Sequence, residues 1–127
     1  MKIIIPGNPI AKSRPRFTRQ GHVYNNQRKI MNDIAFLMRS QWKLKEPYSI
    51  PLTLRITFFM PIPARFKDKL HGLPHISRPD IDNLEKICLD CLVKAGNIIK
   101  DDRFISELHA IKLYDSHPRT EIEITPF

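Results

Sequence analysis

The chain has 127 residues, a length that suits one domain, because two halves of this size would be too small for stable cores. A hydrophobic content of 42% is ordinary for a globular protein and argues against disorder. The formal net charge of +8 favours an anionic partner, with nucleic acid first and a membrane surface second, although charge that serves only solubility is an alternative.

We expect neither a membrane span nor a secretory signal. The sequence lacks a run of about 18 apolar residues, the length that a transmembrane helix needs. The start, Met1 to Pro6, is too short for a signal peptide. We therefore expect a cytoplasmic protein, and the two cysteines agree with a reducing compartment.

A basic segment follows the first predicted strand. Residues 2–6 are rich in Ile and end at Pro6-Gly7, as a short strand does, and residues 7–26 are predicted to form a loop. Basic residues recur in and just after this loop, with no acid before Asp33. The expected DNA-binding residues are Lys12, Arg14, Arg16, Arg19, Arg28 and Lys29, with Arg78 further along the chain.

Two aromatic residues, Phe17 and Tyr24, are interleaved with these basic residues. Arg and Lys bind phosphates, and an aromatic ring stacks on an unpaired base. The alternative is a solvated loop whose aromatic rings pack on the core. The uninterrupted positive charge favours phosphate binding.

A helix and a strand are predicted next. Asn25 or Asn26 can cap a helix that runs to about Trp42. Residues 50–60 alternate between apolar and polar side chains, which predicts a half-buried strand. Helical spacing predicts that the core face of the helix consists of Ile30, Ile34, Leu37, Met38 and Trp42.

Residues 61–79 contain four prolines and several basic residues, which predicts an irregular, mobile surface loop with room for one helical turn near 64–70. This loop either closes over a substrate or is a simple linker. A second helix is predicted over 82–95, where Gly96 ends it. Its predicted buried stripe comprises Leu84, Ile87, Cys88, Cys91, Leu92 and Ala95.

Two final strands are predicted over 104–114 and 120–125, joined as a hairpin by the turn at 115–119. The order of elements is therefore β-α-β-α-β-β. It predicts a small single α+β domain, with a mixed sheet of about four strands and two main helices packed on one face.

Four acids in this basic chain are candidates for a metal site. Asp80 and Asp82 flank the entry of the second helix, and Asp101 and Asp102 follow its end. Mg²⁺ prefers oxygen ligands and takes a few carboxylates together with waters and substrate phosphate. Asp80 and Asp82 can converge if Asp80 is extended and Asp82 begins the helix, with a third ligand from Asp101 or Asp102. Glu107 is a further acid that can approach this site.

Helix capping is the alternative reading of these acids. Asp82 with Glu85 fits a capping box, Asp80 can play the same part with Asn83, and Asp101-Asp102 alone suits a turn. Helix caps are commoner than metal sites, so the spacing by itself favours capping.

Lys86 lies four residues after Asp82, on the same face of the helix. It either forms an ion pair, worth about 0.3–0.5 kcal/mol, or stabilises charge that develops on a scissile phosphate. Asp90 is expected to pair with Lys86 or Lys94. Cys88 and Cys91 lie on the apolar face without a second cysteine pair, so we expect a buried pair and no zinc site.

The stretch Arg78-Pro-Asp-Ile-Asp-Asn-Leu-Glu-Lys86, followed by Leu-Val-Lys-Ala-Gly96 and Ile-Lys-Asp-Asp102, resembles the RusA family of Holliday junction resolvases. The segment Pro9-Ile-Ala-Lys-Ser-Arg-Pro-Arg16 is similar to the opening of the family's phage and prophage branch. The resemblance covers nearly the whole chain, and it favours the metal site over capping.

The resemblance implies a homodimeric endodeoxyribonuclease that nicks two strands of like polarity across a four-way junction in DNA recombination and repair. It implies Mg²⁺ as cofactor, for which Mn²⁺ can substitute. The catalytic acids would be Asp80, Asp82 and Asp102, with Asp101 as a less certain neighbour, and the catalytic lysine would be Lys86. A non-catalytic DNA-binding module and a less selective nuclease for flaps or other branched DNA are the alternatives.

Overall fold

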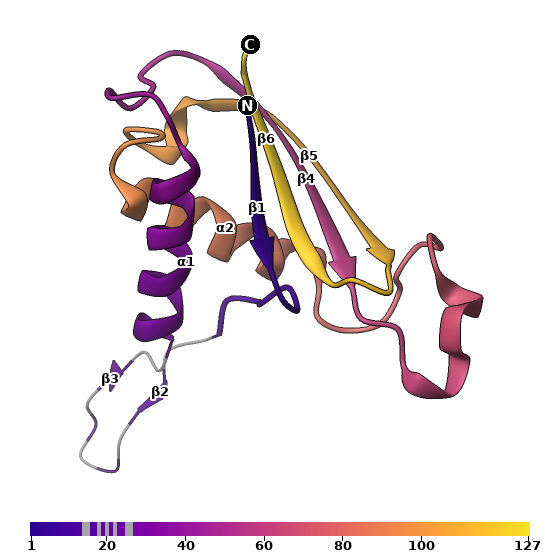
Figure 1. Cartoon of the computed structure of the whole chain (residues 1–127). Helices are drawn as coiled ribbons and strands as arrows, with labels where there is room; N and C mark the ends of the chain where they lie inside the picture. Colours follow the sequence, from indigo (N-terminus) through magenta and orange to yellow (C-terminus); the bar gives the residue numbers. More distant parts are fainter. Residues whose placement is uncertain (14–15, 18, 20, 22, 25–26) are drawn as a thin grey trace.

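A computed structural model describes residues 1–13, 16–17, 19, 21, 23–24 and 27–127 (Figure 1). Its centre is a mixed sheet of four strands, as the sequence predicts, and the strand order is β1-β6-β4-β5. β4 pairs in parallel with β5 and antiparallel with β6, which pairs antiparallel with β1. The strands are β1 Lys2–Pro6, β4 Leu52–Met60, β5 Ile105–Tyr114 and β6 Arg119–Pro126.

The predicted hairpin between the last two strands is wrong, because β4 lies between β5 and β6. The connection crosses the end of β4, where the Asp115 amide donates to the Met60 carbonyl at 2.9 Å. Two interstrand spacings amount to about 10 Å, which a short turn spans easily. Turn residues therefore mark the reversal of the chain without saying which strands pair.

Both long helices cover one face of the sheet (Figure 1), as predicted. The helix α2, Ile81–Ala95, buries all six residues of its predicted stripe and ends at Gly96, whose φ of 86° is left-handed. The inward-facing apolar residues of β4 are also buried in this core: Leu52, Leu54, Ile56, Phe58 and Met60.

The core face of the helix α1, Arg28–Gln41, overlaps the predicted face but is rotated from it. Met31 and Ala35 are buried together with the predicted Met38 and Trp42, whereas Ile30 is 40% exposed. Its N-cap position is Gln27, which makes no capping hydrogen bond in the described structure, while Asn25 and Asn26 lie outside the described residues.

The free edge of β1 is occupied by the end of α1. The Gln41 side chain donates from Nε2 to the Ile4 carbonyl at 2.7 Å and accepts from the Ile4 amide at 2.9 Å. One amide group therefore satisfies both outward-facing backbone groups of Ile4.

Residues 7–26 are not wholly a loop, because β2, Arg16–Phe17, pairs antiparallel with β3, Val23–Tyr24. These strands lie beyond the N-terminal end of α1, away from the main sheet (Figure 1). Gln27 fixes their base, since its side chain donates to the Ala11 carbonyl and accepts from the Ser13 amide, both at 2.7 Å.

The segment 61–79 contains the expected helical turn near 64–70. It is η1, Ala64–Leu70, which consists of two short 3₁₀ turns separated by a kink at Lys67, where φ is 47°. Its second half runs along β5, because the Gly72 amide donates to the Tyr114 carbonyl at 2.8 Å and the His75 amide donates to the Lys112 carbonyl at 3.0 Å. No described helix combines the length and apolarity that a membrane span requires.

Candidate active site

The entry of α2 carries the first pair of candidate acids. Asp80 is the N-cap residue with extended backbone angles (φ −70°, ψ 146°), and Asp82 lies in the first helical turn. Both carboxylates are exposed, and Arg78, Pro79, Asp80 and Asn83 line a hollow at this end of the helix. Asp80 therefore lies outside the helix and Asp82 inside it, which is the condition for the two side chains to converge.

The capping alternative holds for Asp80 in position but not in hydrogen bonding. Asp80 occupies the N-cap position, yet within the described structure its side chain makes no capping hydrogen bond. Asp82 is already helical, so it is not the N-cap of a box with Glu85, and its Oδ1 accepts a local bond from the Asn83 amide at 2.9 Å. The negative charges still suit the positive end of the helix dipole.

Lys86 is oriented by Asp90, as expected. The Lys86 Nζ lies 3.1 Å from Asp90 Oδ1, and the Lys86 side chain is 56% exposed. Lys12 Nζ approaches the other oxygen of Asp90, Oδ2, at 3.4 Å. Asp90 therefore forms ion pairs with two lysines, Lys12 and Lys86, as an acid with a pairing role would.

Glu85 belongs to the same helix end, and sequence reasoning missed it as a functional candidate. Burial, and then the nearby charge of Asp82, raise the pKa of the Glu85 carboxyl. The signal was its spacing of three residues from Asp82, which we interpreted as a cap. Glu85 is an acid whose proton affinity responds to the charge at Asp82.

The second pair of acids lies before β5. Asp101 caps the short 3₁₀ segment η2, Asp102–Phe104, by accepting from the Arg103 amide at 2.9 Å, and this bond is the main cause that lowers the pKa of Asp101. Asp102 is exposed. Asp101 therefore has a local structural role, which leaves Asp102 as the better candidate of the two.

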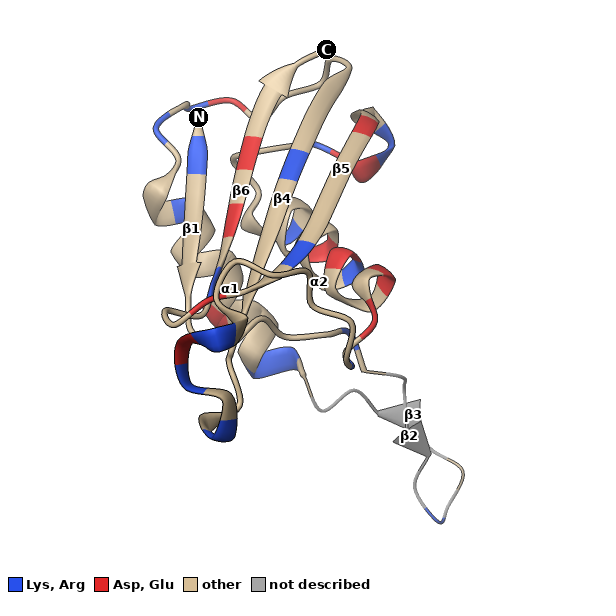
Figure 2. Cartoon of the chain, turned by 90° about the vertical axis from the view of Figure 1, so that its right-hand side faces the viewer, with Lys and Arg blue, Asp and Glu red and all other residues tan. Residues whose placement is uncertain are grey.

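The acids do not assemble into a three-ligand site. Among residues 1–13, 16–17, 19, 21, 23–24 and 27–127, no three Asp, Glu, His or Cys side chains could hold one metal ion. The helix α2 does contact both η2 and β5, and Figure 2 shows acidic residues on α2 and on the turn into β5, beyond the β5 edge of the sheet. The exposed oxygen donors at Asp80 and Asp82 fit Mg²⁺, which commonly takes one or two carboxylates with water and phosphate.

Glu107 has partners outside this site. Its carboxylate accepts from Thr53 Oγ1 at 2.9 Å and lies 3.3 Å from His109 Nε2. The hydrogen bonds from Thr53 and then from His109 lower the pKa of Glu107. These contacts tie Glu107 to neighbouring strand residues.

The predicted DNA-binding residues occupy different environments. Lys12 is partly buried, and its amide donates to the Asn83 carbonyl at 2.9 Å, so it ties the N-terminal segment to α2. Arg19, Arg28, Lys29 and Arg78 are exposed. Arg14 lies outside the described residues, and Arg16 is described only as part of β2.

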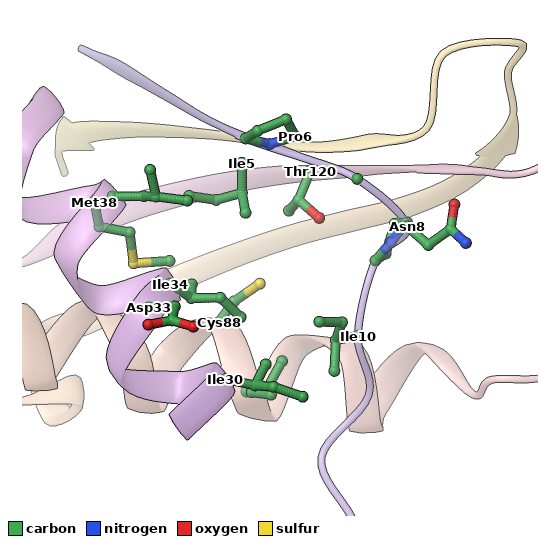
Figure 3. Close-up of a pocket in the computed structure, with 14 residues that line it drawn as sticks. Ile5, Pro6, Asn8, Ile10, Ile30, Asp33, Ile34, Met38, Cys88 and Thr120 are labelled. Atoms are coloured by element: carbon green, nitrogen blue, oxygen red, sulfur yellow. The ribbon is translucent and has the colours of Figure 1, made fainter. Parts of the chain in front are cut away.

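The two cysteines are buried, unpaired thiols, which confirms the expectation of a buried helical pair. Burial raises the pKa of both, that of Cys91 to about 11. Cys88 lines an apolar pocket of about 270 Å³ (Figure 3), to which α1 contributes the predicted core residues Ile30, Ile34 and Leu37. None of the four candidate acids lines this pocket.

We expect His75 to make the free energy of unfolding depend on pH. It is 8% exposed, and burial, followed by the positive charge of Lys112, lowers its pKa below the ordinary value of 6.5. The unfolded chain therefore binds more protons between the two pKa values, so the free energy of unfolding should fall as pH drops from 6.5 through the folded-state pKa. We expect His75→Phe to reduce this loss in urea titrations between pH 7.5 and 5.

The control for this prediction is His117→Phe, the same change at an exposed turn, which should keep the pH dependence of the parent chain. An undiminished loss of stability in His75→Phe would contradict the assignment to His75.

Comparison with known proteins agrees with the resemblance. Residues 6–125 match the family described as Endodeoxyribonuclease RusA. The chain is also 38% identical over 91 residues to the crossover junction endodeoxyribonuclease rusA of Lactococcus phage r1t, an alignment that spans 72% of this chain and 66% of that protein. The family match covers nearly all of the sequence, so the chain belongs to the RusA family of endodeoxyribonucleases.

Proposed function

We propose that the protein is a Mg²⁺-dependent endodeoxyribonuclease that resolves four-way DNA junctions by paired nicks in recombination and repair. The observation that carries the proposal is the entry of α2, where Asp80 holds the cap position without a capping hydrogen bond in the described structure. The exposed carboxylates of Asp80 and Asp82 at this helix entry can therefore serve as oxygen ligands for a cation. Family membership and the phage relative's printed activity support nuclease chemistry at this site.

Each residue of the proposed site has a definite task. Asp80 and Asp82 would hold the ion, with Asp102 as the third acid if substrate or a partner subunit brings it closer. Bound Mg²⁺ would activate a water for in-line attack and stabilise the phosphate, leaving a 5′-phosphate and a 3′-hydroxyl. Lys86 would offset the negative charge that develops on the scissile phosphate, because its exposed ammonium group can leave Asp90 for a phosphate oxygen.

Paired nicks require two active sites, so we propose a homodimer that acts in the cytoplasm. The two sites would face opposite strands of like polarity at the branch point. Mn²⁺ is expected to replace Mg²⁺, since both accept oxygen ligands.

The test is cleavage of a synthetic four-way junction with Mg²⁺, alongside flap and linear duplex substrates. Nicks at symmetric positions in the junction, without cleavage of the flap or the linear duplex, support the proposal. Equal cleavage of flaps would indicate a less selective nuclease. Tight binding without cleavage would indicate a non-catalytic DNA-binding module.

Arg78→Ala should weaken junction binding and lessen its dependence on salt. Arg78 is exposed beside Asp80, where a phosphate would enter. Loss of one phosphate contact should reduce the slope of log K against log salt by about 1. The measurement is a binding titration at several salt concentrations without divalent metal.

The matched control is Arg65→Ala, in η1, where the guanidinium lies 4.7 Å from the centre of the Phe66 ring. Arg65→Ala should change the slope of log K against log salt less than Arg78→Ala does. An unaltered slope in Arg78→Ala would exclude this phosphate contact.

A further inference from the structure

The backbone that leads into Asp80 is fixed by one side chain from the edge strand of the sheet. Lys112 Nζ donates to the Ser77 carbonyl at 2.9 Å and to the Pro79 carbonyl at 2.8 Å. Pro79 immediately precedes Asp80, so the second bond ends one peptide unit from the candidate metal ligand.

Lys112 itself is held firmly. It lies in β5 opposite Phe58 of β4, and its carbonyl accepts from the His75 amide at 3.0 Å. The same residue therefore joins the segment 75–79 to the sheet twice, once through its backbone and once through its side chain. The contact between Tyr114 and the His75 ring, with 4.7 Å between ring centres, packs the beginning of this segment.

The Lys112 ammonium group suits this task because it has three N–H donors, so a single nitrogen can donate to both carbonyls. The other anchor of Asp80 is the helix, since its carbonyl accepts from the Leu84 amide at 3.2 Å. The Asp80 backbone is thus held from the sheet side by Lys112 and from the helix side by α2. Loss of either anchor would let the carboxylate move relative to Asp82.

We propose that Lys112 is a positioning residue of the active site, which sets the place of Asp80 by clamping the Ser77 and Pro79 carbonyls to β5. The inference rests on the proposed function for its catalytic meaning, because it takes Asp80 as a ligand of Mg²⁺. Lys112 acts through Asp80 and does not touch the ion or the scissile phosphate. Removing a group that orients a metal ligand typically costs roughly 10- to 100-fold in metal affinity or activity.

The variants are Lys112→Met, which keeps most of the apolar stem and loses the donors, and Lys112→Arg, which keeps donors. Lys2→Met is the control, because it removes the same charge from β1, the strand at the opposite edge of the sheet. If Lys112→Met does not fold, Lys112→Gln takes its place, since its amide is neutral and has two N–H donors in place of three, on a shorter side chain.

Two measurements decide the proposal. Hydrogen exchange at residues 76–84 should quicken in Lys112→Met but not in Lys2→Met or Lys112→Arg. The Mg²⁺ concentration for half-maximal junction cleavage should rise roughly 10-fold or more, with partial rescue by saturating Mg²⁺ and by arginine. Without divalent metal, junction binding by Lys112→Met should depend on salt as binding by Lys2→Met does, because Lys112 makes no phosphate contact.

Unchanged exchange together with an unchanged Mg²⁺ requirement in Lys112→Met would overturn the inference, as would an altered salt slope with unchanged exchange. If the parent chain cleaves no junction with any divalent metal, the proposed function fails. The exchange measurement would then still decide whether Lys112 orders the segment that carries Asp80.

Discussion

Asp82→Asn should abolish junction cleavage while junction binding stays equal or becomes tighter. The change removes a charged oxygen ligand and also removes a negative charge that repels phosphate. The expected loss of cleavage rate is at least roughly 100-fold, the scale on which one group that stabilises a transition state contributes. The local fold should survive, because the asparagine oxygen can still accept from the Asn83 amide.

The measurements for this variant are single-turnover cleavage in Mg²⁺ and junction binding without divalent metal. Asp33→Asn is the control, since it makes the same change at an exposed position of α1 and should leave both quantities unaltered. Cleavage by Asp82→Asn at the parent rate would exclude Asp82 from the site. Unfolding of the variant would restore the structural interpretation of Asp82.

Phe58→Ala should cost about 3–5 kcal/mol of unfolding free energy, the range for large-to-small changes at buried aromatic residues. Phe58 is 1% exposed and lies on the inner strand β4, between the sheet and the helices. Small domains are stable by about 5–15 kcal/mol, so this single change would consume a large part of that margin. The measurement is urea unfolding followed by circular dichroism.

Phe36→Ala makes the same substitution on α1, where the ring is 64% exposed, and should stay within about 0.5 kcal/mol of the parent. A similar loss in both variants would mean that Phe36 is covered in solution, for instance by a second copy. A small loss in Phe58→Ala would contradict the described core.

The sequence predicts the long elements well because burial imposes periodicity on them. On α2, the apolar residues at helical spacing admit one inward face, and Gly96 ends the helix in a left-handed conformation. On α1, consecutive apolar residues such as Ile30 and Met31 lie on adjacent faces of the helix, so more than one face is apolar. Periodicity alone leaves the inward side open there, and contacts with α2 decide it.

The candidate site is less predictable, because it depends on contacts between residues far apart in the chain. The motif around Asp80 and Asp82 marks the helix entry correctly. The link from Lys112 to Pro79 joins residues 33 positions apart, and no local pattern indicates it. The pairing of β6 with β4 and the ion pair of Lys12 with Asp90 are equally non-local.

The Gln41 side chain on β1 limits how two copies can assemble. With the outward backbone groups of Ile4 already bonded, a neighbouring molecule cannot extend the sheet through the middle of β1. The segment 72–75 covers the C-terminal part of β5 in the same way. Dimerisation through a shared continuous sheet is disfavoured at these places, which directs attention to the broad faces.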